Sequence, residues 1–284
     1  MSGYTLFRIF KYVLFGLFTF NLFYYLGEDL DAYRYLGADA TLSDILETFA
    51  VTIDYVAWMV LIVLFEFETD FLSKNQTEGK LKWLFKGGVA LCYPILVYAF
   101  YGYIMALTSF QDFHPIPSET VCELVDQDFA YVSMEARYLP LNETNCVTIS
   151  EGEVFQHSSD KAVSAAEPLA ASINLSWIDV ANAAAWLLVV LLFEIEVILQ
   201  ERGTLGRTSL IVIKASKGVL YSTLLCDAIL WSFYGAFIDS WDAYLWIVAF
   251  VIIDLNVFNF AGKPSSDKSE TKSVMQDAGQ PTQT

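Results

Sequence analysis

Two aspartates stand far inside apolar stretches of this chain, where a charge is expensive. Asp227 and Asp254 each lie about ten residues, or about 15 Å of α-helix, inside the stretches 217–238 and 244–261. A turn expected between Ser240 and Trp241 would place both carboxylates at one depth. A charged aspartate at a bilayer centre costs at least about 2.5 kcal/mol, so the pair should share a proton, face water or bind a cation. The alternative is two neutral acids, hydrogen-bonded to Ser222, Ser232, Asn256 or tyrosine hydroxyls.

Four glutamates end two copies of one motif. The stretch "AWMVLIVLFEFE" (57–68) recurs as "AWLLVVLLFEIE" (185–196). Each copy is followed by a basic loop, a Lys-Gly pair and an aromatic stretch that ends in Phe-Tyr-Gly. This pattern indicates a duplicated helix hairpin over 53–105 and 181–238. Both first helices run in the same direction, so the copies are parallel repeats, an arrangement found in transporters. Duplication of a purely structural hairpin would give the same pattern.

One interpretation of these glutamates is structural. A helix C-terminus carries partial negative charge, so acids there need partners. The next helix of each hairpin begins with a lysine near the same boundary, and an ion pair would explain why both features were duplicated together. The predicted structural pairs are Glu66 or Glu68 with Lys86, and Glu194 or Glu196 with Lys217.

The other interpretation is a path for charge. Asp54 and Glu68 are separated by a spacing that brings them within about 40° of each other on a helix of 3.6 residues per turn. Asn182 and Glu196 repeat that spacing, so each repeat would present one polar stripe to a central axis. Together with the two deep aspartates, these four residues form the candidate ion or proton pathway.

No motif for catalysis, metal binding or cofactor binding accompanies these acids. The two histidines, His114 and His157, lack metal-ligand spacing, and the chain has no phosphate-binding glycine loop and no nucleophile elbow. We therefore expect no enzyme, no metal and no cofactor. A serine or aspartate nucleophile needs no local motif, so an intramembrane enzyme stays open as a third hypothesis.

The composition predicts that these residues belong to a membrane protein. The chain of 284 residues is 55% hydrophobic and only 17% charged, against about 25% charged in soluble domains. Apolar stretches of about 20 residues, long enough to cross a bilayer core, predict six spans. The first is interpreted as an uncleaved anchor, because no small-residue cleavage site directly follows it. The predicted spans are 6–26, 50–69, 87–109, 176–199, 217–238 and 244–261.

The basic residues predict the orientation. With the N-terminus inside, thirteen Lys and Arg lie on the cytoplasmic side and three lie outside. This positive-inside bias predicts an inner or plasma membrane protein with both termini in the cytoplasm. The outer loop 110–175 carries eleven Asp and Glu against two basic residues, which disfavours nucleic acid as a partner. The same loop holds Cys122 and Cys146, which are predicted to form a disulfide on the oxidising side.

The predicted fold is an all-α integral membrane protein with six transmembrane helices, a duplicated parallel hairpin and a small extracytoplasmic cap. The cap is expected to be irregular, with β-leaning pieces such as "NCVTIS", and "LSDILETFAV" is expected to form a short amphipathic segment. The predicted parts are an N-terminal anchor (1–27), an outer segment with the first hairpin (28–109), the outer loop (110–175), the second hairpin (176–238), the sixth helix (239–261) and a disordered tail (262–284).

Two functions fit this description. The first is a cation or proton channel or transporter that uses the buried carboxylates. The second is a non-catalytic membrane scaffold or accessory subunit that binds a protein partner. Six helices are few for a complete transporter, so a homo-oligomer is expected. Besides the lipid bilayer, the expected ligand is a monovalent cation or a proton.

Overall fold

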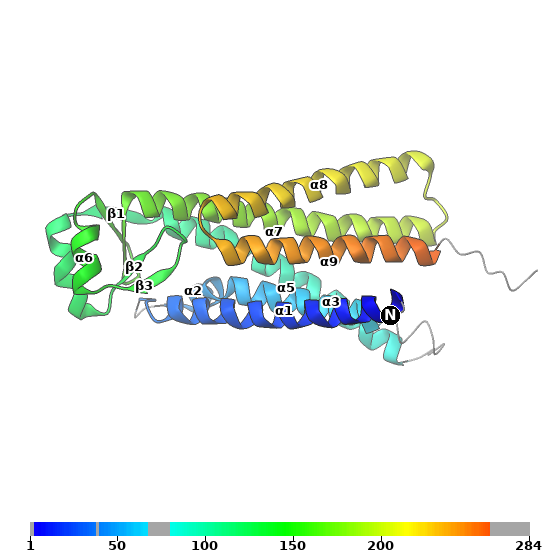
Figure 1. Cartoon of the computed structure of the whole chain (residues 1–284), viewed down its shortest axis with the longest axis horizontal. Coiled ribbons are helices and arrows are strands. Elements are labelled where there is room, and N and C mark those ends of the chain that lie inside the picture. Colours follow the sequence, from blue (N-terminus) through cyan, green and yellow to red (C-terminus); the bar gives the residue numbers. More distant parts are fainter. Residues whose placement is uncertain (1–2, 38–39, 68–79, 262–284) are drawn as a thin grey trace, which may run out of the picture. The chain divides into compact units, whose positions relative to one another are not determined.

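Long helices make up most of the chain (Figure 1). The structure is a computed structural model that describes residues 3–37, 40–67 and 80–261. Many large apolar side chains on these helices are exposed, as expected for helices that face lipid. The main helices are α1 (Gly3–Tyr33), α2 (Leu42–Thr48), α3 (Ala50–Phe67), α5 (Lys80–Gln111), α7 (Ala166–Glu201), α8 (Arg207–Phe233) and α9 (Phe237–Ala261).

Four of these helices are long and apolar enough to cross a bilayer, and a bent pair would make a fifth. The sixth predicted span, 244–261, falls within α9, but its side chains beyond Phe250 lie outside the described residues, so this span stays a prediction. The described helices support a multi-pass membrane protein. The candidate spans are Ile9–Tyr33, Gly87–Gln111, Ala166–Gln200, Arg207–Phe233 and the pair Leu42–Thr48 with Ala50–Leu64.

The bend in the fifth candidate span has a local cause. The predicted amphipathic segment folds as α2, which begins with a capping box between Thr41 and Asp44. The chain leaves α2 at Phe49 and turns by 64° into α3. The predicted first span 6–26 is too short, because α1 continues to Tyr33.

The chain divides into two compact units, Met1–Tyr244 and Leu245–Thr284. In the first unit α1 packs on α3, α3 on α5, α5 on α7, and α7 on α8. Trp58 and Trp186, the equivalent tryptophans of the two motif copies, contact each other with ring centroids 5.9 Å apart. In the second unit the rings of Trp246 and Phe250 contact each other within α9. The parallel repeat itself stays a prediction.

The turn between α8 and α9 lies earlier than predicted. Helix α8 ends at Phe233, and Gly235 adopts a φ of +81° while Ala236 N–H donates to Trp231 O at 3.0 Å. This is a Schellman C-cap, which favours glycine in the left-handed conformation. Ser240, predicted to lie in the turn, is inside α9. The predicted position of the turn is therefore wrong, and the meeting of Asp254 with Asp227 stays a prediction.

Residues 112–165 form a compact domain that we call the cap. Its sheet has the strand order β1-β4-β5-β2-β3, in which β2 and β5 are parallel and the other neighbours antiparallel. A small apolar core that includes Val121, Val154 and Val163 holds it together. The elements are β1 (Phe113–Ile116), the 3₁₀ helix η2 (Ser118–Gln127), β2 (Ala130–Val132), β3 (Tyr138–Pro140), α6 (Glu143–Ile149), β4 (Val154–His157) and β5 (Ala162–Ala165).

The structure corrects two expectations about the cap. It is a regular five-stranded sheet rather than an irregular loop. The stretch "NCVTIS" lies largely in helix α6 rather than in a strand. Asn142 accepts hydrogen bonds from the N–H groups of Thr144 and Asn145 and so starts the helix, which outweighs the β propensity of the β-branched residues.

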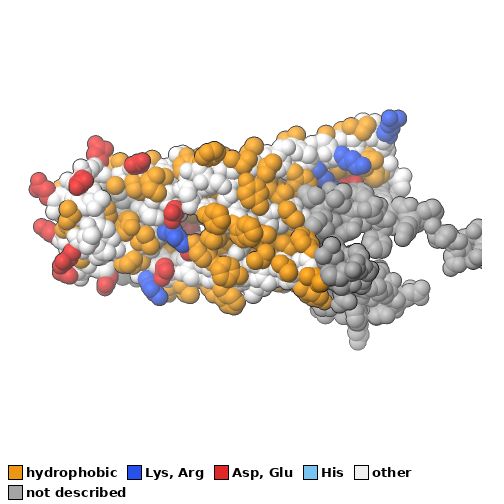
Figure 2. Space-filling model, viewed as in Figure 1, with side chains coloured by type: hydrophobic (Ala, Val, Ile, Leu, Met, Phe, Trp, Pro, Cys, Tyr) orange, Lys and Arg blue, Asp and Glu red, His pale blue; other side chains and the backbone are white. Residues whose placement is uncertain are grey.

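The cap joins the helices at one end of the first unit. Strand β5 leads directly into α7, and Lys161 N–H donates to Tyr35 O at 3.0 Å in the segment after α1. Gly37 approaches Ser159 O so closely that a Cβ there would lie 2.6 Å from it. Figure 2 shows acidic side chains on the cap and apolar side chains over the helices. We call the cap side of each helix its cap end and the other side its opposite end.

The predicted disulfide is confirmed: Cys122 in η2 is bonded to Cys146 in α6. Replacing both cysteines by serine should lower the stability of the cap by about 3 kcal/mol, because the bridge closes a chain loop in the unfolded state. Limited proteolysis of the folded protein at rising temperature would show earlier cleavage within 112–165. Cys226→Ser, which removes an exposed unpaired thiol, is the control. Equal cleavage of both variants would contradict this role.

Candidate functional site

Five helices carry aspartates near their cap ends. Asp54 lies within electrostatic reach of Asp242, and Asp179 within electrostatic reach of Asp227, so the ionised forms of each pair repel each other. Most of the carboxylates are engaged by hydrogen-bond donors from neighbouring helices. We call this set the carboxylate network: Asp29 on α1, Asp54 on α3, Asp179 on α7, Asp227 on α8 and Asp242 on α9.

Asp242 lies at the junction of three helices. Its Oδ1 accepts hydrogen bonds from Asn21 Nδ2 at 2.6 Å and from the Tyr55 hydroxyl at 2.7 Å. Asn21 is completely buried, and its Oδ1 has no hydrogen-bond partner. The ring of Tyr55 packs on the ring of Tyr25 with centroids 5.4 Å apart. A buried carboxylate is thus stabilised by two neutral donors.

Asp29 and Asp54 join α1, α3 and α5. Asp29 Oδ2 accepts the Thr52 N–H at 3.1 Å, in the first turn of α3. This contact caps the helix, since an acid at a helix N-terminus is favourable. Asp54 Oδ2 accepts from the Tyr103 hydroxyl of α5 at 3.2 Å. Asp29 therefore has a structural role, whereas Asp54 bonds to a group that can itself exchange a proton.

Asp179 and Asp227 join α7 and α8. Asp179 Oδ1 accepts from Trp231 Nε1 at 3.2 Å. Asp227 is buried beside Asn182, yet Asp227 Oδ2 and Asn182 Nδ2 both lack a hydrogen bond of ordinary geometry. An unpaired buried carboxylate oxygen is costly, so this pair is the least satisfied point of the network.

Arg137, a residue of the cap, contacts α1 beside the carboxylate network. Arg137, which lies just before β3, donates to Glu28 and to the Tyr24 hydroxyl on α1. Its guanidinium also lies 5.4 Å from the centroid of the Tyr24 ring. Glu28 in turn lies within electrostatic reach of Asp239 at the start of α9. These contacts connect the half-exposed cap surface to the buried acids.

At the opposite end the second motif copy holds an ion pair. Lys217 Nζ lies 2.7 Å from Glu196 Oε2, with both side chains buried, and lies 3.6 Å from the centroid of the Phe193 ring. Glu194 instead accepts a hydrogen bond from the Tyr93 hydroxyl of α5. Of the two predicted alternatives, the structure brings Glu196 to Lys217.

An apolar layer separates the two ends. On α7, Asn182 and Glu196 are about 21 Å apart along the helix axis, and the fully buried Val189 lies midway between them. Trp58 and Trp186 contact each other in the same region. Among the described residues, buried apolar side chains therefore lie between the network and the ion pair. Other side chains of this layer with almost no exposed surface are Leu61, Leu96 and Leu224.

The structure describes only part of the predicted pathway. Asp54, Asn182 and Asp227 lie in the carboxylate network, and Glu196 is engaged by Lys217. The remaining predicted residues lie outside the described side chains, so the ion pair of the first hairpin and the contact between two deep aspartates stay predictions. These residues are Glu66, Glu68, Lys86 and Asp254.

Sequence reasoning missed three members of the network. Asp29, Asp179 and Asp242 lie near or beyond the ends of the predicted spans, and the sequence prediction gave them no functional role. A signal was available on α1, because Asn21, Tyr25 and Asp29 recur every four residues on one helix face. Polar residues that share one face near the end of a helix thus indicated buried contacts, and the prediction of spans from hydropathy did not use this pattern.

A second cluster resembles a serine hydrolase triad. His157 Nε2 lies 3.1 Å from Ser109 Oγ, and His157 Nδ1 lies 3.3 Å from Asp160 Oδ2. However, Nδ1 accepts the backbone N–H of Asp160 at 2.9 Å. The neutral ring therefore carries its proton on Nε2 and donates it to Ser109, which is the reverse of what a general base requires. The cluster ties α5 to the cap and gives no support to hydrolase chemistry.

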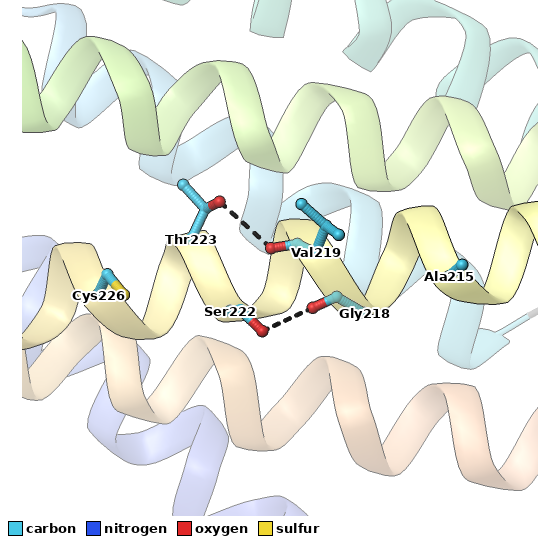
Figure 3. A pocket seen from close by; sticks show the side chains of 6 residues that line it. All are labelled: Ala215, Gly218, Val219, Ser222, Thr223 and Cys226. Carbon is cyan, nitrogen blue, oxygen red and sulfur yellow. Dashed lines mark hydrogen bonds between the residues drawn. The ribbon is translucent and has the colours of Figure 1, made fainter.

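A groove of about 490 Å³ runs along α8 (Figure 3). The hydroxyls of Ser222 and Thr223 bond to the carbonyl oxygens of Gly218 and Val219 on the same helix, so their polar atoms are satisfied locally. Small side chains on a membrane helix allow another helix to approach closely. The groove is lined by Ala215, Gly218, Val219, Ser222, Thr223 and Cys226.

No protein-family model, curated protein or solved structure matches the chain. Within the described residues, no group of three or more His, Cys, Asp and Glu side chains could hold a metal ion.

The ion pair between Glu196 and Lys217 yields a quantitative prediction. Glu196→Gln should lower the free energy of unfolding by about 3–5 kcal/mol, because the buried Lys217 then loses its carboxylate partner. Lys217→Met should have a similar cost, and the double variant should cost less than the sum. Denaturant unfolding in detergent measures all three. Glu194→Gln combined with Lys217→Met is the control cycle and should be nearly additive. Strict additivity in both cycles would contradict the pairing.

Proposed function

We propose that this multi-pass membrane protein transports a cation or a proton by way of its buried carboxylates. The observation that carries the proposal is the carboxylate network, in which five helices each bring one aspartate to the cap end. Ionisable side chains inside membrane helices are expensive and are by default candidates for ion pathways. The hydrogen-bond donors to Asp54, Asp179 and Asp242 include neutral hydroxyl, indole and amide groups, which do not themselves neutralise a carboxylate.

The proposed orientation puts the cap outside the cell. It is supported by the sequence, in which thirteen basic residues fall in the predicted inner segments and three in the predicted outer segments. The acidic cap would then attract cations toward the network from the outer solution. Arg137 and Glu28 would form the outer end of the path.

The apolar layer between the two ends favours a carrier or a gated channel over an open pore. In the described part of the chain, fully buried apolar residues such as Leu61 and Val189 lie between the network and the opposite end. A permanently open pore does not fit that packing. A carrier or a gated channel, in which the helices rearrange to expose the acids to the other side, does fit it. A closely packed apolar layer is equally compatible with a protein that transports nothing, which is the alternative function.

The alternative is a non-catalytic scaffold or accessory subunit that binds a protein partner. It is favoured by the buried ion pair of Glu196 and Lys217, which stabilises a hairpin without any transport role. The groove on α8 adds to it, because its small residues suit a second membrane helix. In this alternative, the buried aspartates would serve only to hold the helices in register.

Flux measurements on Asp227→Asn discriminate between the two functions. The substitution keeps the shape of the side chain and removes its titration, so transport of protons, sodium or potassium into proteoliposomes should be lost while the fold is kept. The scaffold alternative predicts a harmless or mildly stabilising change, because a buried amide is cheaper than a buried charge.

The control for this experiment is Glu151→Gln, which removes one acid from the exposed cap surface and should leave the flux unchanged. Circular dichroism and the unfolding midpoint would show that each variant is folded. If the wild-type protein moves none of the three ions, transport is refuted and the scaffold function stands.

A further inference from the structure

We infer that the ion handled by the carboxylate network is the proton rather than a metal cation. This inference rests on the proposed transport function and names its substrate. Its basis is the way in which the carboxylate oxygens and their amide neighbours are arranged.

Hydrogen-bond donors occupy the positions that a metal cation would need. Asp242 Oδ1 receives both an amide N–H and a hydroxyl O–H, Asp54 Oδ2 faces a hydroxyl, and Asp179 Oδ1 faces an indole N–H. A bound cation requires several oxygen lone pairs that converge on one point. Here one oxygen of each of these carboxylates already accepts a hydrogen bond, and in the described part of the chain no three acidic, histidine or cysteine side chains converge on one point.

Two asparagines are placed to serve both protonation states of the acids beside them. Asn21 donates through Nδ2 to the ionised Asp242, while its own Oδ1 is buried without a partner. When Asp242 takes up a proton, the new O–H needs an acceptor, and the amide oxygen of Asn21 becomes that acceptor when the amide rotates. An amide offers two donors and one acceptor oxygen on adjacent atoms.

The second asparagine repeats this arrangement on α7 and α8. Asp227 Oδ2 and Asn182 Nδ2 are both buried and unsatisfied, although the two side chains are neighbours. Asn182 can donate to the carboxylate or accept from the carboxylic acid, depending on its amide orientation. Proton uptake forms one O–H bond on the carboxylate, with the proton supplied by water or a neighbouring carboxyl group, and release reverses it. No other bond changes.

Other ionisable groups surround Asp242 from each helix that packs on it. Tyr25 and Glu28 approach from α1, Tyr55 and Asp54 from α3, and Asp239 lies one turn earlier on α9. These groups place exchangeable protons at intervals between Glu28 at the half-exposed surface and the buried Asp242, where Tyr55 donates directly. An arrangement of this kind conducts protons through bond exchange and needs no cavity wide enough for a hydrated metal ion.

The test compares ions in proteoliposomes that contain a pH-sensitive dye. An imposed proton gradient should change the internal pH with choline as the only external cation, and radioactive sodium should not enter. Tyr55→Phe and Asn21→Leu should each slow the proton flux by about tenfold or more, since each removes one relay partner. Tyr101→Phe, an exposed tyrosine on α5, is the matched control and should keep the wild-type rate.

Two results would overturn the inference. One is sodium or potassium uptake that proceeds without any change of internal pH. The other is a proton flux that stays at the wild-type rate in a folded Tyr55→Phe or Asn21→Leu variant. The complete absence of flux is a different result, because it refutes the proposed transport function itself. If Asn21→Leu does not fold, Tyr55→Phe alone decides.

Discussion

A carboxylate inside an apolar helix bundle must be given hydrogen-bond donors, and this requirement shapes the cap end of the molecule. The donors are neutral groups from other helices, so these acids become fixed contacts between two or three helices. Asp242 ties three helices together through Asn21 and Tyr55. Removing a donor would cost the fold a buried hydrogen bond, which is why the helices cannot slide past one another freely at this level.

Buried acids have different kinds of partner at the two ends of the bundle. At the opposite end Glu196 is paired with Lys217, and such a buried ion pair is costly to break. At the cap end the acids are held by neutral donors and keep their capacity to bind a proton. The apolar layer between the ends isolates one from the other. The first arrangement is suited to stability, and the second is suited to transport.

The helices were predictable from sequence because their apolar lengths match a bilayer, and the disulfide was predictable because Cys122 and Cys146 share one loop. The turn after α8 was misplaced because Gly235 ends the helix inside an apolar stretch, where hydropathy gives no signal. Counted from Gly235, the residue that matches Asp227 on α9 is Ala243, the neighbour of Asp242. With the turn misplaced, the sequence prediction did not pair Asp242 with Asp227 in depth. The network required three-dimensional information, since its members come from five separate helices.

The central claim is that the buried aspartates exchange protons while the fold stays intact. Infrared difference spectroscopy between alkaline and acid conditions tests it directly, because a protonated buried carboxyl has a C=O band distinct from that of a carboxylate. The account predicts such a band in the wild-type protein, reduced in Asp242→Asn and reduced further when Asp227→Asn is added. An identical difference spectrum in the wild-type protein and the folded double variant would contradict the account.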